Sequence, residues 1–359
     1  MKKVIVSVTN DLSTDQRVAK VCTTLHNASF DVFLIGRKLP NSLPLNRIYT
    51  TKRINLLFNK GFLFYAEYNI RLFFLLLLSK KNILLSNDTD TLLANYLVSK
   101  FQNKKLVFDS HELFSEIPEL VNKSLVKKFW QRIENLVIPK LKHNYTVCKS
   151  IADYYKEKYN TDFGIIKNLP LQKEIIQGKF FFSTENKKVI LYQGAINIGR
   201  GLELMIDTVK HLPNCMFVIA GSGDIINDLK LKVSTLKLEN QVKFLGKLSP
   251  NELQTITPLA DIGISLEEDL GLNYRFALPN KIFDYIQAET PVLVSNLPEM
   301  KQVVLEYKVG EIAMSRNPEK LAQQIENLLK KDLKKELIKA KKELIWEQQE
   351  KKLINIFNS

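Results

Sequence analysis

The stretch "SLEEDLGLNYRFALPNKIFDYIQAETPVLVSN", residues 265–296, contains the repeating unit from which the fold is inferred. An apolar strand is predicted to end at Ser265, and a helix is predicted to follow with Asn280 as its N-cap. A second apolar run, "PVLVSN", follows at 291–296. Continuous apolar strands separated by helices indicate a parallel sheet that is covered on both faces.

The same alternation runs outward in both directions along the chain. With 359 residues the protein is too long for one ordinary core, so two domains are expected. The predicted fold is α/β, with two tandem doubly wound parallel sheets at 1–168 and 169–345. The strands predicted in the first half are "KVIVSVT", "DVFLIG", "NILLSND", "KLVFDS" and "NYTVC"; those in the second are "KVILYQG", "CMFVIAGSG", "QVKFLG", "DIGISL" and "PVLVSN".

Composition excludes several classes of protein. The chain is 45% apolar and 25% charged, which is typical of a globular protein and disfavours disorder. Its three cysteines lie far apart without a CxxC pair, which argues against a disulfide framework or zinc site and for a reducing compartment. No other metal-ligand cluster is visible, so no metal is expected. "MKKVIVSVTNDLS" is interpreted as a first strand rather than a signal peptide, because Asn10 and Asp11 end its apolar run.

One apolar segment, "LLFNKGFLFYAEYNIRLFFLLLLSKK" at 56–81, has two interpretations. Its continuous apolar centre, residues 72–78, is too short to span a bilayer. The segment is therefore either a buried helix of the first domain or a helix partly immersed in a membrane surface.

Positive charge is concentrated in the first half of the chain. Residues 1–170 contain 26 Lys and Arg against 14 Asp and Glu, a net charge of +12, whereas residues 171–359 carry only +2. A basic half indicates an anionic partner, such as an acidic membrane surface or a phosphorylated substrate. Nucleic acid is not expected, because no zinc spacing, RNP aromatic motif or arginine-rich tract is present.

Two cations occur where helices are predicted to begin, although a cation there costs a few tenths of a kcal/mol or more. Lys281 follows Asn280, and Arg200 follows a strand in "YQGAINIGRGLELMI", residues 192–206. Ligands of parallel α/β sheets bind at the carboxyl ends of strands, so a diphosphate in a cleft between the domains would explain both cations. The alternative for Arg200 is a tight turn with a solvated side chain.

Glycines after the strands support an anion site in the second domain. Gly194, in the same stretch as Arg200, allows a ligand to approach the backbone closely. Gly221 and Gly223 in "VIAGSGD" are a weaker signal, since such a pair also serves simple turns. The spacing differs from GxGxxG, which disfavours NAD.

Residues 265–296 also resemble the motif of the retaining family 4 glycosyltransferases, which have the GT-B architecture. That family carries a pattern close to P-S-x-x-E-x-F-G-L-x-x-x-E-A-M-A-x-G-x-P-V. "SLEEDLGL" is similar to its first part and places the first family glutamate at Glu268, while "FDYIQAETPVL" places the second acid at Asp284. The two acids are sixteen positions apart here rather than eight, and Thr290 replaces the usual glycine.

The resemblance implies a metal-independent enzyme of polysaccharide biosynthesis that needs no cofactor. It would transfer a sugar from a nucleotide-diphosphate sugar to a glycan or lipid-linked acceptor with retention of configuration. The expected donor contacts are Gly194, Arg200, Gly221, Gly223, Leu272, Asn273, Lys281 and Asp284. Two alternatives remain open: a GT-B nucleotide-sugar epimerase, or a non-catalytic homologue that binds nucleotide sugar.

In the first domain, the resemblance implies a histidine that faces the donor sugar. His111 in "FDSHELFSE" is the candidate, and Glu112 and Glu116 are the alternatives. With Glu268 and Asp284, His111 completes the expected catalytic set. Residues after other strands are expected on the acceptor side: Asn10, Asp15, Arg17 and Asp88, with Asp90 as an alternative to Asp88.

The resemblance also covers the end of the chain. A terminal helix at about 346–359 is expected to cross back and pack on the first domain, with Trp346 as a packing anchor. The enzyme is expected to be cytoplasmic and peripheral on the inner face of the cytoplasmic membrane.

Overall fold

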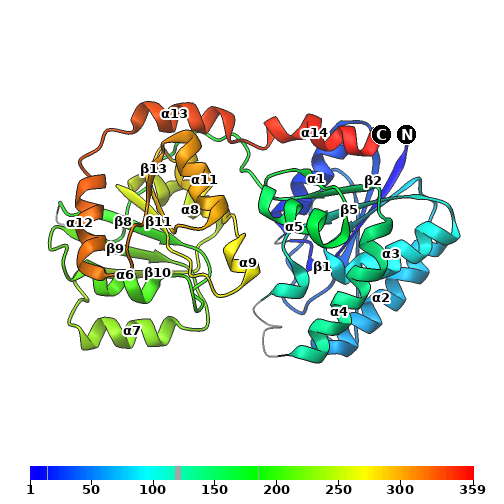
Figure 1. Cartoon of the computed structure of the whole chain (residues 1–359), viewed down its shortest axis with the longest axis horizontal. Helices are drawn as coiled ribbons and strands as arrows, with labels where there is room; N and C mark the ends of the chain where they lie inside the picture. The colour runs from blue at the N-terminus through cyan, green and yellow to red at the C-terminus, as the bar shows by residue number, and fades with distance from the viewer. Residues whose placement is uncertain (14, 118–122, 185) are drawn as a thin grey trace. The chain divides into compact units, whose positions relative to one another are not determined.

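The computed structural model describes every residue of the chain except 14, 118–122 and 185. It divides into two compact units (Figure 1). Unit 1 consists of Met1–Asn168 together with Gln349–Ser359, and unit 2 consists of Leu169–Gln348.

Unit 1 is built on a seven-stranded sheet in which every strand pair is parallel. The strand order is β3-β2-β1-β4-β5-β6-β7. The strands are β1 (Lys3–Asp11), β2 (Asp31–Arg37), β3 (Thr50–Ile54), β4 (Ile83–Asn87), β5 (Lys105–Ser110), β6 (His143–Thr146) and β7 (Gly164–Ile165). The helices are α1 (Gln16–Asn27), α2 (Gly61–Leu78), α3 (Thr89–Phe101), α4 (Ser124–Val137) and α5 (Lys149–Tyr159), with short 3₁₀ turns at Phe114–Glu116 and Ile138–Lys140.

Unit 2 repeats this design with six parallel strands in the order β10-β9-β8-β11-β12-β13. The strands are β8 (Lys188–Gln193), β9 (Cys215–Ala220), β10 (Val242–Gly246), β11 (Ile262–Ser265), β12 (Val292–Val294) and β13 (Gly310–Ile312). The helices are α6 (Leu202–Val209), α7 (Ile226–Thr235), α8 (Pro250–Ile256), α9 (Leu272–Arg275), α10 (Asn280–Gln287), α11 (Pro298–Tyr307), α12 (Pro318–Leu328) and α13 (Lys334–Glu343), with a 3₁₀ turn at Thr257–Leu259.

Both faces of the unit 2 sheet are covered, because successive residues of a strand point to opposite faces. In β8, Ile190 packs with α6, α7 and α12, whereas its neighbour Leu191 packs with α10, α11 and α13. The predicted fold class, two tandem doubly wound parallel sheets, is therefore confirmed.

Two details differ from the sequence prediction. Helix α10 begins at Asn280, so Pro279 occupies the capping position and the prediction of Asn280 as N-cap is wrong. Strands β3, β7 and β13 were not predicted. Each of them is the last strand at an edge of its sheet. Edge strands pair on one side only, so they need no long apolar run, although the fourth edge strand, β10, was predicted from the apolar residues of "QVKFLG".

Helix α14 (Glu347–Asn358) fixes the chain end to unit 1, which confirms the predicted return of the terminal helix (Figure 1). The ring of Phe357 makes an edge contact with Phe30, and the Lys105 ammonium donates to the carbonyl of Ile356 at 2.7 Å. Just before this helix, Trp346 is buried within unit 2 and its backbone N–H donates to the carbonyl of Pro170 at 2.7 Å.

Helix α2 buries one stripe only. Phe64, Tyr68, Leu72 and Leu76 recur at every fourth position and are buried, while the other apolar side chains of the helix are partly or largely exposed. By length and composition alone, this helix is also apolar enough to cross a membrane. The prediction of a buried helix therefore describes one face of α2, and the second face presents apolar groups to solvent.

Candidate functional sites

In unit 2, the two predicted cations converge on one carboxylate that the sequence analysis did not single out. The Lys281 Nζ lies 2.9 Å from Oε1 of Glu267, and the Arg200 Nη1 lies 3.7 Å from the same oxygen. Lys281 is only 9% exposed and Glu267 is fully buried. The three residues lie just beyond β8 and β11, where the strand order reverses, which is where doubly wound sheets bind ligands.

Glu267 is held in its ionised form. Burial alone would raise the pKa of its carboxyl, but the Lys281 ammonium outweighs burial and lowers that pKa below its ordinary value. The Ser265 hydroxyl donates to Oε2 of Glu267 at 2.7 Å, which fixes the second oxygen. The Lys281 ammonium also lies 4.0 Å from the ring centroid of Tyr192, a cation–π contact. The site is thus a prepositioned pair of cations, the buried Lys281 and the partly exposed Arg200, with one compensating buried anion.

Arg200 has hydrogen-bonding capacity left over. Its Nε is buried and has no hydrogen-bond partner in the described part of the chain. The guanidinium faces the ring of Tyr274 at 5.3 Å. The following residue, Gly201, has a φ of +73°, and a Cβ there would lie 2.3 Å from the carbonyl of Leu266, so only glycine fits at this turn. The turn thereby places Arg200 against the loop that carries Glu267.

The glycine pair after β9 has a structural reason of its own. A Cβ on Gly221 would lie 1.8 Å from the carbonyl oxygen of Gly194, because the loop after β8 lies directly on the loop after β9. A Cβ on Gly223 would similarly meet the carbonyl of Ile196 at 2.2 Å. These two glycines allow the loops to stack, and their contact with a donor stays a prediction.

Other predicted residues of unit 2 lie around this centre. Glu268 turns away from the two cations, since its side chain is 39% exposed and pairs with Arg316 at 2.8 Å. Asp284 accepts a hydrogen bond from the side chain of Gln193 at 3.2 Å. Leu272 and Asn273 form the first turn of the short helix α9. The roles of these four residues in donor binding and catalysis stay predictions.

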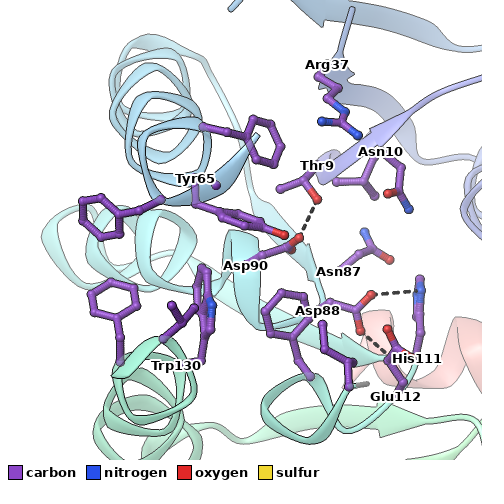
Figure 2. A pocket seen from close by; sticks show the side chains of 18 of the residues that line it. Thr9, Asn10, Arg37, Tyr65, Asn87, Asp88, Asp90, His111, Glu112 and Trp130 are labelled. Carbon is purple, nitrogen blue, oxygen red and sulfur yellow. Dashed lines mark hydrogen bonds and ion pairs between the residues drawn. The ribbon is translucent and has the colours of Figure 1, made fainter. Parts of the chain in front are cut away.

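Unit 1 contains a pocket of about 770 Å³ at the carboxyl ends of β1, β4 and β5 (Figure 2). Helices α2 and α4 form its opposite side. Of the residues predicted for unit 1, His111, Glu112, Asn10, Asp15, Asp88 and Asp90 line it. Arg17 and Glu116 are outside the lining: Arg17 is buried against Asp109, and Glu116 pairs with Lys127 at 2.6 Å.

His111 lies between two carboxylates in this pocket. Its Nε2 lies 3.0 Å from Asp109. Its Nδ1 lies 3.2 Å from Asp88, and its backbone N–H donates to Asp88 at 2.8 Å (Figure 2). Burial alone would lower the pKa of His111, but Asp88 and Asp109 outweigh burial and raise it to about 9. The ring is therefore an imidazolium near neutral pH, with both nitrogens acting as donors.

Arg17 holds Asp109, the partner of His111, although Arg17 itself does not line the pocket. Its guanidinium makes two hydrogen bonds to Asp109, at 2.9 and 3.1 Å. Burial would raise the pKa of Asp109, but Arg17 and then His111 outweigh burial and hold it at about 2. The series of ion pairs Arg17–Asp109–His111–Asp88 fixes the orientation of the imidazolium.

Two further carboxyls at the polar end of the pocket titrate near neutrality. Burial raises the pKa of Asp88 to about 7 and that of Asp90 to about 8, and Asp90 accepts a hydrogen bond from the Thr9 hydroxyl. Asp88 has a φ of +55°, an unusual value for a residue other than glycine, and its N–H donates to the carbonyl of Asp109 at 2.8 Å. The polar end can therefore both donate and accept hydrogen bonds at pH 7.

We expect the protein to lose stability as the pH rises from 6.5 to 9.5. The folded-state pKa of His111, about 9, exceeds its ordinary 6.5, so its favourable contribution is complete below pH 6.5 and is lost as the pH rises through 9. The raised folded-state pKa values of Asp88, about 7, and Asp90, about 8, also lower stability as the pH rises from the ordinary 3.8 of these carboxyls through those values. The expected loss is on the order of 1–3 kcal/mol, or roughly 2–12 °C in Tm.

The variant His111→Gln isolates this effect when thermal unfolding is followed by circular dichroism at constant ionic strength. It should show a flatter decline of Tm with pH than the parent, whereas His26→Gln, on α1 outside the pocket, should follow the parent. Parallel curves for the two variants would contradict the assignment.

Comparisons with known proteins bear on both units. Residues 175–344 match the family described as glycosyl transferases group 1. Among curated proteins, the O-antigen chain mannosyltransferase RfbU of Salmonella typhimurium is 25% identical over 232 residues. That match covers 59% of this chain and 62% of the relative's own length.

Solved structures match over the whole chain. A glycosyltransferase from Rickettsia africae is similar with a TM-score of 0.75 and 15% identity, covering 99% of this chain and 97% of the other. Alr3699/HepE of Anabaena, solved in complex with UDP-glucose, is similar with a TM-score of 0.74 and 12% identity, and both chains are fully covered. At these identities the likeness shows the fold, which is the GT-B fold.

Proposed function

Because residues 175–344 of this chain match the family described as glycosyl transferases group 1, we propose that the protein transfers a sugar from a nucleotide-diphosphate sugar to a glycan or lipid-linked acceptor. We further propose that the transfer retains the anomeric configuration and needs no metal ion. The observation that carries the proposal is the convergence of Lys281 and Arg200 at the switch point of the unit 2 sheet.

The cations suit a diphosphate leaving group. The Nε of Arg200 has no hydrogen-bond partner among the described residues, and Lys281 pairs with a carboxylate that a bound phosphate would compete with. Fixed positive charge in a buried site stabilises the negative charge that develops as the diphosphate departs. These two residues would thus do the work that a metal ion does in other phosphate sites, which supports metal independence. The carboxylate of Asp284 is proposed to accept hydrogen bonds from the ribose hydroxyls.

The residues of unit 1 suit sugar hydroxyls rather than a covalent intermediate. His111 is protonated near pH 7 and therefore serves as a hydrogen-bond donor, and in unit 2 Glu267 is engaged in a buried ion pair. Neither is a free nucleophile, which supports same-face attack by the acceptor. We propose that His111 binds the donor sugar, while Asn10, Asp15 and Asp88 bind acceptor hydroxyls. Arg17 acts as a positioning residue through Asp109.

The function is tested with radiolabelled nucleotide sugars and a membrane extract as the source of acceptors. Labelled product in a lipid or glycan fraction supports the proposal, and its absence with Lys281→Met ties the activity to this site. Interconversion of sugar isomers would instead identify an epimerase. Binding of the nucleotide sugar without turnover would identify a non-catalytic homologue.

We also propose that the protein is cytoplasmic and binds the inner face of the membrane peripherally. Two features support membrane binding: the net charge of +12 over residues 1–170, and the exposed apolar face of α2.

Flotation with lipid vesicles tests the membrane proposal. We expect binding to vesicles that contain phosphatidylserine, and at least about tenfold weaker binding to purely zwitterionic vesicles, since each basic residue near the surface contributes about 1 kcal/mol. Raising the salt from 0.05 to 0.5 M should release the protein, because the Debye length shortens. Binding that is independent of both lipid charge and salt would contradict the electrostatic contribution.

A further inference from the structure

The unit 1 pocket has two chemically different ends, which together restrict what it can bind. Figure 2 shows Tyr65 and Trp130 on one side of the pocket, and Asn10, Asn87 and His111 on the other. The two sides come from different elements: helices α2 and α4 supply the first, and the ends of β1, β4 and β5 supply the second.

The apolar end is a connected cluster of aromatic rings. The ring centroids of Tyr65 and Trp130 are 5.0 Å apart, those of Trp130 and Phe129 are 5.2 Å apart, and those of Phe129 and Phe62 are 5.7 Å apart. All three contacts are edge-to-face, so the rings support one another across α2 and α4. The cluster runs from the buried Trp130 to Phe62, which is 63% exposed.

The polar end has an unused acceptor as well as the charged groups around His111. Asn87 is 2% exposed and lines the pocket. Its Nδ2 donates to the carbonyl of Ser7 at 3.1 Å, but its Oδ1 has no partner in the described part of the chain. A buried acceptor without a partner is costly, and a ligand hydroxyl would satisfy it. Donors and acceptors side by side at this end match hydroxyl groups, which are both.

The volume of the pocket and the exposure of its apolar residues indicate a ligand larger than a sugar. A cavity of about 770 Å³ lies in the upper part of the range typical of small-molecule sites. A polyol at the strand ends would leave Phe62, Leu125 and Phe129 in water, although all three line the same pocket and are exposed. A hydrocarbon chain along these residues would remove that apolar surface from water, which is favourable.

We propose that this pocket binds an amphiphilic acceptor, a glycolipid whose sugar hydroxyls meet Asn10, Asn87 and Asp88 while its hydrocarbon chain lies along the aromatic cluster of α2 and α4. The inference deepens the proposed function and rests on it for taking this pocket as the acceptor site. It selects the lipid-linked acceptor over a soluble glycan.

Tryptophan fluorescence can test the proposal because the chain has two tryptophans, and only Trp130 lines the pocket. The Trp346→Phe variant leaves Trp130 as the only tryptophan in the chain. It is titrated with dodecyl maltoside below its critical micelle concentration and, separately, with maltose. We expect a saturable change in Trp130 emission with dodecyl maltoside, and binding of maltose that is roughly 30-fold weaker or undetectable. If Trp346→Phe folds poorly, the parent protein is compared with its Trp130→Phe variant. The change in emission with dodecyl maltoside should be absent from that variant.

A matched pair of variants on α2 separates the pocket from general detergent binding. Phe62→Asp changes a lining residue that contacts Phe129, and should weaken dodecyl maltoside binding roughly tenfold. Phe74→Asp changes a residue on the same helix that is 56% exposed and does not line the pocket, and should leave binding within about twofold.

Binding of UDP, GDP and ADP, measured by calorimetry on the same preparation, keeps the two proposals apart. If the protein binds UDP but has equal affinity for maltose and dodecyl maltoside, the glycolipid inference is overturned and the proposed function stands. Equal losses in Phe62→Asp and Phe74→Asp would also overturn it. Binding of dodecyl maltoside through Phe62 without binding of UDP, GDP or ADP would support an amphiphile site and remove the proposed function.

Discussion

Replacing Lys281 with methionine is expected to lower the kcat of sugar transfer by about 10²–10³-fold, the loss that follows removal of one preorganised contact to a developing negative charge. The ammonium is buried, fixed by Glu267 and Tyr192, and therefore needs little reorganisation when the diphosphate leaves. Arg200→Met should act in the same direction but more weakly, because the Arg200 side chain is more exposed than that of Lys281.

Binding measurements show whether the lost contact is to phosphate. A charge-assisted hydrogen bond contributes about 1.5–3 kcal/mol, so each variant should bind nucleoside diphosphate about 10–150-fold more weakly. Affinity for the free nucleoside should not change. Lys188→Met is the matched control, since Lys188 is a basic residue of unit 2 that pairs with Asp261 instead. Equal loss of nucleoside and nucleoside diphosphate binding would remove the phosphate role of Lys281.

Replacing Glu267 with alanine is expected to destabilise unit 2 by about 3–5 kcal/mol, because it leaves the Lys281 ammonium buried without its partner. The double variant Glu267→Gln/Lys281→Met removes both charges. It should recover most of that stability, since replacing a buried ion pair with neutral groups is often close to neutral. Transfer activity should stay lost in the double variant, because the diphosphate still lacks its cation.

Unfolding in urea can be followed in unit 2 alone. In a Trp130→Phe background, the buried Trp346 of unit 2 is the only tryptophan left in the chain, so its emission reports the unfolding of that unit. We expect a lower urea midpoint for Glu267→Ala and a largely restored midpoint for the double variant. An unchanged midpoint for Glu267→Ala would show that the ion pair contributes nothing to the fold, and would weaken the case that it prepositions Lys281.

The sequence by itself determined the two doubly wound sheets and showed that candidate site residues follow the strands. This was possible because the central strands are buried on both faces, so each is a continuous apolar run that can be read locally. Strands β3, β7 and β13 were not predicted, because an edge strand needs no continuous apolar run. Lys281 and Arg200 were also recognisable locally, since a cation at the start of a helix opposes the helix dipole.

Only the tertiary structure decided which carboxylate and which network complete each site. Glu267 and Glu268 are neighbours of the same type, so no spacing rule separates them, yet one is fully buried against Lys281 and the other pairs with Arg316. Likewise, Asp109 is joined to Arg17 across 92 positions of sequence. Such pairs depend on which strands become neighbours in the sheet. The environment that sets the pKa of each carboxyl therefore exists only once the strands have assembled.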